Sequence, residues 1–280
     1  MKKIGFIDYY LDEWHANNYP EFIAKASEGR YKVCYAYGKI DSPLEGGMTN
    51  KAWAEEHGVE LLDSIEEVVE KSDYLIVLSP DNPEMHEELC QLPLRSGKLT
   101  YVDKTFAPDK ATALRIFAIA EESGTPCYSS SALRFCTEWN DIDKAAIDKI
   151  YSEGPYEFDR YGIHQIEPIV LLMNCPAKRV MALDTDKHPQ VFIEFEDGRS
   201  AVVTNFYDDV TGFTHKIVNA KNESITIPVE SDYFALFIDN LVKYFDSGMA
   251  SVSHAQTIDV IGIIEAGTKA LANPYTWYEV

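Results

Sequence analysis

Short apolar runs alternate with helical patterns through the first 130 residues of the chain. Five apolar runs predict β-strands, at residues 4–7, 31–37, 74–78, 99–102 and 126–129. Helices are predicted between them, at residues 18–27, 50–57, 64–71, 84–92 and 109–123. Because the run at 74–78 is apolar throughout, it indicates a strand buried on both faces. Strands and helices alternating at this spacing predict a doubly wound parallel sheet, the Rossmann-like class of α/β fold.

The pattern changes after Arg134. Helices are predicted at residues 139–152 and 166–173, strands at 190–196, 200–207 and 214–220, and helices again at 233–246 and 255–272. Strands in succession followed by helices predict an α+β arrangement with a mainly antiparallel sheet. We therefore expect two domains. Residues 1–130 form a Rossmann-like nucleotide-binding domain, and residues 131–280 form an α+β domain for substrate binding and oligomerisation.

Composition excludes several classes of protein. Hydrophobic residues make up 46% and charged residues 25%, which is typical of a globular chain. The apolar runs are too short to span a bilayer, and Met1–Lys3 leads directly into a strand, so we expect no export signal. Five scattered cysteines lack metal-ligand spacing, which favours a reducing cytoplasm over a disulfide framework or a zinc site. A net charge of −21 disfavours nucleic acid or an anionic membrane as partner.

The turn after the first strand lacks the glycines of a dinucleotide-binding loop. Those glycines let the backbone approach a pyrophosphate, which then sits on a helix N-terminus. Here Asp8, Asp12 and Glu13 place three carboxylates where two phosphate charges would lie. Standard binding of the pyrophosphate is therefore disfavoured. The second strand also ends without the acidic residue that usually binds the ribose, and Asp41 is a poor substitute.

Ligands of such sheets bind at the carboxyl ends of the strands. On that basis we expect any dinucleotide to meet the ends of four strands. The expected contact residues are Ile7, Asp8, Tyr9, Tyr37, Ser79, Pro80, Asp81, His86, Asp103 and Lys104. A lone histidine such as His86, on an amphipathic helix, also has a simpler interpretation as a surface or packing residue.

Two positions carry side chains suited to proton transfer. Lys104 follows a predicted strand directly, where a lysine can act as a general acid or polarise a carbonyl oxygen, although a surface lysine would look the same. His164 and Glu167 are three residues apart and would share one face of a helix. A histidine oriented by a carboxylate is a usual proton-transfer arrangement, and a buried structural histidine fits the same pattern. We see no third ligand at metal-binding spacing, so we expect no metal.

Taken together, these features resemble the Gfo/Idh/MocA family of NAD(P)-dependent sugar and polyol oxidoreductases, over nearly the whole chain. Asp103-Lys104-Thr105 is similar to the family's Glu-Lys-Pro motif, and residues 131–135 resemble its crossover ending in Arg-Phe. Residues 160–167 resemble its Asp-x-Gly-x-His-x-x-Asp stretch, with Arg160 in place of the first aspartate. Residues 256–271 resemble the family's closing helix.

The resemblance implies hydride transfer between a sugar or polyol carbon and NAD or NADP. It implies that Lys104 and His164 handle the hydroxyl proton with Glu167 in support, and that Arg134, Arg160 and Tyr161 bind substrate. It also implies a homo-oligomer, a dimer or tetramer. Two other interpretations stay open at this point. One is a descendant without cofactor that binds a small molecule or joins an assembly. The other is a non-redox sugar lyase or isomerase that uses Lys104 and His164.

Overall fold

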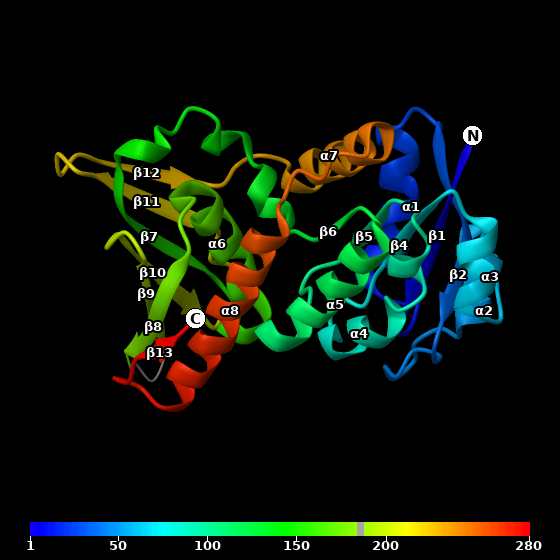
Figure 1. The fold of residues 1–280 in the computed structure, drawn as a ribbon, viewed down its shortest axis with the longest axis horizontal. Helices are drawn as coiled ribbons and strands as arrows, with labels where there is room; N and C mark the ends of the chain where they lie inside the picture. The colour runs from blue at the N-terminus through cyan, green and yellow to red at the C-terminus, as the bar shows by residue number, and fades with distance from the viewer. Residues whose placement is uncertain (184–187) are drawn as a thin grey trace. The chain divides into compact units, whose positions relative to one another are not determined.

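The structure is a computed structural model that describes residues 1–183 and 188–280. Its chain forms two compact units, each with its own sheet (Figure 1). Unit 1 comprises Met1–Ser130 and Ala235–His254. Unit 2 comprises Ser131–Phe234 and Ala255–Val280.

Unit 1 is built on a six-stranded sheet in which every paired neighbour is parallel. Its strands are β1 (Lys2–Asp8), β2 (Tyr31–Gly38), β3 (Glu60–Leu61), β4 (Tyr74–Val77), β5 (Thr100–Val102) and β6 (Cys127–Tyr128). They lie in the order β3-β2-β1-β4-β5-β6. The order reverses between β1 and β4, and at such a switch point the carboxyl ends of parallel strands form a crevice. The predicted doubly wound parallel sheet is confirmed.

Helices connect these strands, and most begin at a capping side chain. They are α1 (Trp14–Ala26), α2 (Asn50–His57), α3 (Ile65–Lys71), α4 (His86–Leu89) and α5 (Lys110–Ser123). Ser64 and Asp109 cap α3 and α5, each accepting a hydrogen bond from a backbone N–H of the first turn. The helix predicted at 84–92 is shorter than expected. It is one turn of α-helix between two 3₁₀ turns, Pro83–Met85 and Pro93–Arg95, because proline at 93 cannot donate the hydrogen bond that would extend it.

Helix α7 (Tyr233–Ser247) belongs almost entirely to unit 1, although the sequence placed it in the second domain. Its Phe245 ring lies 5.8 Å from the ring of Tyr31 and 4.8 Å from that of Tyr74, both on strands of the parallel sheet. Its Phe237 ring lies 5.8 Å from that of Tyr19 on α1, and Figure 1 shows α1 and α7 side by side. These aromatic contacts hold α7 on the first sheet.

Unit 2 is built on a seven-stranded mixed sheet. Its strands are β7 (Ile147–Pro155), β8 (Ala177–Leu183), β9 (Gln190–Phe195), β10 (Ser200–Phe206), β11 (Thr214–Asn219), β12 (Ser224–Pro228) and β13 (Tyr278–Glu279). They lie in the order β12-β11-β7-β10-β9-β8-β13. Among the strands that the structure describes in this sheet, the β7–β10 pair alone is parallel, so the predicted mainly antiparallel sheet is confirmed. Helices α6 (Phe158–Met173) and α8 (His254–Ala272) complete the unit.

One prediction for unit 2 is wrong. The helix expected at 139–152 is two 3₁₀ turns, Thr137–Trp139 and Lys144–Ala146, followed by β7. Strand β7 is central and bonds to β10 on one side and β11 on the other, while Ile147 and Ile150 are buried. Pairing with a neighbouring strand on each edge makes such a segment a strand, even where its local sequence pattern favours a helix. In addition, α6 begins at Phe158, eight residues earlier than expected (166 − 158), so it contains the whole stretch 160–167.

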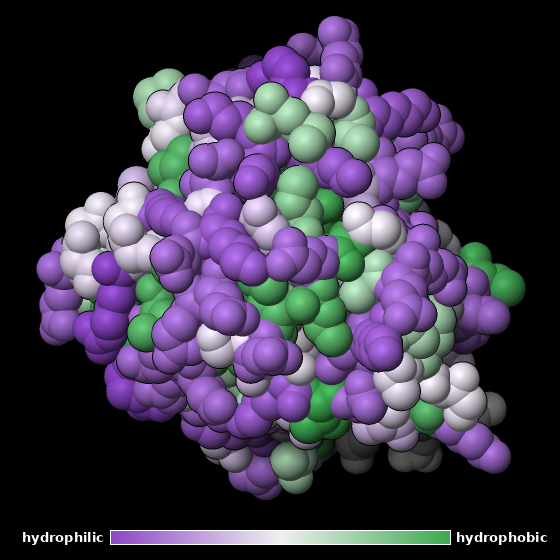
Figure 2. Space-filling view, turned by 90° about the vertical axis from the view of Figure 1, so that its right-hand side faces the viewer, coloured by the Kyte–Doolittle hydropathy of each residue, from purple (hydrophilic) through white to green (hydrophobic). Residues whose placement is uncertain are grey.

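The protein is strongly acidic, since it has 46 Asp and Glu residues and only 25 Lys and Arg residues. Hydrophilic side chains dominate the face in Figure 2, with hydrophobic areas dispersed among them. Within the described ranges, the helices are all too short or too polar to cross a membrane.

Candidate functional site

Asp8 is the last residue of β1 and lies at the carboxyl edge of the parallel sheet. Its Oδ1 accepts hydrogen bonds from the Ser79 hydroxyl at 2.8 Å and from the Tyr9 N–H at 2.6 Å. Among the described residues no group hydrogen-bonds to the buried Oδ2, and Asp8 is 1% exposed. Burial raises the pKa of Asp8 well above its usual value, against the lowering effect of these hydrogen bonds. The site therefore favours the protonated form of this carboxyl.

Glu13 caps the N-terminus of α1 with its side chain. Its carboxylate accepts a hydrogen bond from the His15 N–H at 2.7 Å and another from the Ala16 N–H. The residue is 7% exposed. Burial, and then the charges of Asp8 and Asp103, raise the pKa of Glu13 well above its usual value. The helix end that would face a phosphate in a dinucleotide-binding loop thus carries a side chain of the same protein.

Asp103 follows β5 and pairs with a histidine that the sequence analysis did not single out. Its Oδ2 is hydrogen-bonded to Nδ1 of His15. Its Oδ1 accepts hydrogen bonds from the Tyr101 hydroxyl at 3.1 Å and the Lys104 N–H at 2.9 Å. Burial acts to raise the pKa of Asp103, but the charge and hydrogen bond of His15, with the charge of Lys104, lower it below its usual value. His15 and Asp103 are 88 residues apart, so no local spacing could reveal the pair.

Lys104 lies just after a strand of the parallel sheet, as the sequence predicts. It comes directly after the buried Asp103, at the carboxyl end of β5, and its side chain is half-buried. A lysine in this position can present its ammonium to an oxygen of a ligand at the edge of the sheet.

The other expected contact residues of unit 1 differ in exposure. Ile7 is fully buried in β1, so only its backbone is available, and Pro80 is buried after β4. Tyr9 and Tyr37 are half-buried, and Asp81 is exposed. Ser79 is buried and bonds to Asp8, as described above.

His86 does not line this edge, contrary to the expectation. It is 0% exposed; Nδ1 lies 3.0 Å from the Phe106 carbonyl oxygen, and Nε2 meets that of Leu78. Burial lowers the pKa of His86, against the raising effect of these carbonyls. Its imidazole therefore lies between two backbone carbonyl groups inside the unit, and its N–H can donate to either of them.

Asn50 fills the space at the end of β2. Its side-chain NH₂ donates to the carbonyl oxygens of Gly38 at 3.0 Å and Ile40 at 2.6 Å, and its Oδ1 accepts from the Leu11 N–H at 3.0 Å. A Cβ atom at Gly38 would lie 2.4 Å from this amide, so a larger residue there would displace the Asn50 side chain. The amide joins the first βα turn to the strand end where a ribose would bind.

In unit 2, His164 lies on α6 and its Nδ1 is 2.7 Å from the hydroxyl of Ser131. The rings of Tyr161 and Phe213 lie edge-on to the imidazole, at 5.2 and 5.8 Å between centroids. The imidazole is half-buried. A histidine whose one nitrogen is fixed by a hydroxyl has a defined ring orientation, which proton transfer requires.

Glu167 bonds to Arg134 and to the backbone of Ser131, and its expected support of His164 stays a prediction. Its Oε2 accepts a hydrogen bond from Arg134 at 2.9 Å, and its Oε1 accepts from the Ser131 N–H at 3.2 Å. The guanidinium of Arg134 also donates to Gln256. The side chains of Arg134 and Glu167 are 4% and 2% exposed, so this is a buried ion pair. These bonds hold the guanidinium of Arg134 inside the unit, and its expected role in substrate binding stays a prediction.

Arg160 and Tyr161 occupy the first turns of α6. Arg160 is exposed, and Tyr161 is half-buried with its ring 4.3 Å from that of Tyr156. Tyr161 also contacts His164, as described above, so these two predicted residues are brought together. Helical geometry explains this, because residues three apart share a face.

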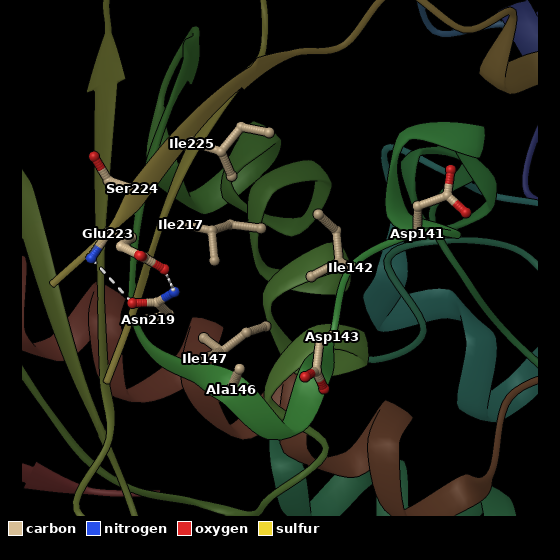
Figure 3. Close-up of a pocket in the computed structure, with 10 residues that line it drawn as sticks. All are labelled: Asp141, Ile142, Asp143, Ala146, Ile147, Ile217, Asn219, Glu223, Ser224 and Ile225. Atoms are coloured by element: carbon tan, nitrogen blue, oxygen red, sulfur yellow. Dashed lines mark hydrogen bonds between the residues drawn. The ribbon is translucent and has the colours of Figure 1, made fainter. Parts of the chain in front are cut away.

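A separate hollow of about 250 Å³ lies in unit 2 (Figure 3). Side chains of Ile142, Ile147, Ile217 and Ile225 surround it, and Glu223 at its margin bonds to Asn219 at 2.8 Å. None of the predicted site residues lines it. Among residues 1–183 and 188–280 no three His, Cys, Asp or Glu side chains form a group that could hold a metal ion.

Comparison with known proteins gives matches to solved structures alone. No protein-family model matches the chain, and no curated protein sequence matches it. GenD2 from gentamicin A biosynthesis, solved in complex with NAD, is 13% identical, with a TM-score of 0.77 over 100% of this chain and 97% of that one.

Two further structures match over nearly their full length. Apo scyllo-inositol dehydrogenase from Lactobacillus casei is 14% identical, with a TM-score of 0.75 over 99% of this chain and 98% of that one. UDP-N-acetylglucosamine 3-dehydrogenase GnnA from Acidithiobacillus ferrooxidans is 12% identical, with a TM-score of 0.73 over 97% and 98%. Over nearly its whole length, the chain therefore has the fold of these dehydrogenases.

Proposed function

We propose that this protein is an oxidoreductase that acts on a sugar, a polyol or a sugar-derived acid, with NAD or NADP as its cofactor. The observation that supports it most is the match over nearly the whole chain to dehydrogenases, whose names specify an inositol, a nucleotide sugar and, for GenD2, bound NAD. Proteins of shared fold diverge in chemistry, so the residues at the two candidate sites have to supply the mechanism.

Lys104 and His164 are the proposed proton-transfer residues. The ammonium of Lys104, at the end of β5, would donate a hydrogen bond to the reacting oxygen and stabilise the charge that develops on it. The imidazole of His164 would accept the hydroxyl proton. Ser131 positions that ring through its bond to Nδ1. In reactions of this class the nicotinamide supplies or accepts the hydride.

The first βα turn does not fit a dinucleotide bound in the standard way. Glu13 occupies the N-terminus of α1, and Asn50 fills the end of β2. A pyrophosphate at α1 would meet a carboxylate in place of free N–H donors. A dinucleotide on this protein must therefore be held by other contacts.

A second candidate function is non-redox: a lyase or isomerase that moves a proton on the same class of substrate with Lys104 and His164. The side chain of Glu13 at the phosphate position favours this candidate, because an enzyme without a dinucleotide has no need of that position. The two candidates share their proton-transfer residues and differ in their need for cofactor.

Cofactor titration and product analysis separate the two candidates. NAD, NADH, NADP and NADPH are titrated up to millimolar concentration against tryptophan fluorescence, and inositols, aldoses and aldonic acids are then incubated with and without cofactor. The proposed function predicts binding and cofactor-dependent oxidation. The absence of both would refute it, and an isomerised or dehydrated product formed without cofactor would establish the second candidate.

Variants then test the residue roles. Lys104→Ala and His164→Ala should each abolish turnover, Ser131→Ala should lower kcat/KM and shift the pH profile, and the exposed Lys243→Ala should leave turnover unchanged. Full activity in Lys104→Ala or His164→Ala would remove that residue from the mechanism.

We also infer that the protein works in the cytoplasm as a homo-oligomer. All five cysteines are free, as expected in a reducing compartment. In unit 2, Phe192 and Val202 are half-buried on the face of the sheet opposite to the buried Ile193 and Val203, which is a natural surface for a second copy. Light scattering after size exclusion tests this, and a mass of 31.7 kDa would refute the oligomer.

A further inference from the structure

We propose that the side chain of Glu13 takes the place of a dinucleotide phosphate at α1, and that it thereby limits the affinity of this protein for dinucleotides. The inference rests on the proposed function only in its choice of NAD(H) and NADP(H) as ligands. It concerns a residue that determines specificity at the carboxyl edge of unit 1.

The hydrogen-bond donors at this helix end are already used. The first N–H groups of an α-helix lack partners within the helix, and they carry the positive end of its dipole. In dinucleotide-binding Rossmann domains, a phosphate accepts from these groups. Here the N–H groups of His15 and Ala16 donate to the Glu13 carboxylate. A phosphate would have to displace that carboxylate before it could bind in the same way.

The loop around Glu13 is packed with side chains where glycines would leave room for a ligand. Tyr10 is 7% exposed and Leu11 is fully buried. The backbone N–H of Leu11 is bound by Asn50, which also holds the end of β2. The positions that would receive the pyrophosphate and the ribose are therefore both filled by the protein.

Electrostatic repulsion also disfavours a phosphate at the N-terminus of α1. The carboxyl groups of Asp8 and Asp103 are buried close enough to Glu13 to interact with it electrostatically. A dinucleotide would add two phosphate charges beside these acidic groups, and each group in its ionised form would repel them. Like charges in a weakly screened interior repel more strongly than in water. Removing the Glu13 carboxyl should therefore free two N–H donors and also remove the repulsion that its ionised form exerts.

The test measures dissociation constants for NADH and NADPH in four proteins: wild type, Glu13→Gly, Glu13→Gln and Glu21→Gln. Glycine is tolerated at an N-cap and removes both the carboxylate and its bulk. Glutamine keeps an oxygen that can accept the cap hydrogen bonds and removes only the charge. Glu21 is exposed on the same helix, so Glu21→Gln is the control for a lost charge.

We expect Glu13→Gly to bind at least about tenfold more tightly than wild type, with a smaller gain of about threefold for Glu13→Gln, since two N–H donors and one charge are at stake. Glu21→Gln should match wild type. Circular dichroism and thermal unfolding verify that each variant is folded. If Glu13→Gly does not fold, the inference is tested with Glu13→Gln instead. An unchanged dissociation constant in that variant then overturns the inference.

The outcomes separate this inference from the proposed function. Tight binding by Glu13→Gly with no binding by wild type supports the inference and refutes a dinucleotide as the cofactor of the natural protein. Binding by wild type with no gain in Glu13→Gly overturns the inference and leaves the proposed function standing. Binding by neither protein overturns both.

Discussion

Replacing Glu167 by leucine would leave the guanidinium of Arg134 inside unit 2 without its carboxylate. The pair is joined at 2.9 Å, with side chains 4% and 2% exposed, so water cannot replace the lost partner. Leucine is close in size to glutamate and has no acceptor. The backbone N–H of Ser131, which also donates to Glu167, would lose its bond as well.

The expected loss of stability is large for a single substitution. Breaking a buried ion pair by removing one member typically costs about 3 to 5 kcal/mol, because an unpaired charge remains in the interior. An N–H group left without an acceptor adds about 1 to 3 kcal/mol. The hydrogen bond from Arg134 to Gln256 remains, and it still compensates in part for the burial of the guanidinium. We expect a net loss of about 4 kcal/mol in the free energy of unfolding.

Urea unfolding, followed by circular dichroism, measures this loss in a double-mutant cycle. The four proteins are wild type, Glu167→Leu, Arg134→Met and the double variant. In the double variant no unpaired charge remains, so we expect it to be more stable than Glu167→Leu. The pair Lys269–Glu265 on α8, with side chains 57% and 27% exposed, is the control, and Glu265→Leu should cost less than about 1 kcal/mol.

Two results would refute this reasoning. One is a loss below about 1 kcal/mol for Glu167→Leu, which would mean that the pair is solvated like a surface pair. The other is strict additivity of the two substitutions, which would mean that the residues do not interact. Either result would mean that Glu167 does not hold Arg134 in place.

Two further predictions follow from buried ionisable groups. Because burial raises the pKa of Asp8 in the folded state, wild-type stability should fall as pH rises from the usual aspartate pKa, about 4, towards the raised value. The advantage of Asp8→Asn in Tm should therefore grow over that range, and a constant difference would contradict it. Burial also raises the pKa of Cys127 and Cys136 to about 12, so at neutral pH a thiol reagent should modify the half-buried Cys34 and Cys175 first. Mass spectrometry of the native protein, with unfolded protein as control, checks this order.

Local patterns in the sequence indicated five of the six strands of the first sheet, all except β3. The apolar run that became β4 and the capping residues Ser64 and Asp109 act through neighbours in the chain, so they are readable without the fold. The same holds for Lys104, whose place at the carboxyl edge follows from the strand before it. The missing glycines likewise indicated an altered phosphate site.

Only the tertiary structure decided which distant residues meet. Strand β7 has a sequence that resembled a helix, and pairing on both sides made it a strand. Helix α7 joins unit 1 through aromatic contacts with strands far from it in sequence. His15 pairs with Asp103, and Glu167 bonds to Arg134 and to the backbone of Ser131. Hydrogen bonds and ion pairs depend on distances of a few ångströms in space, which spacing along the chain does not encode.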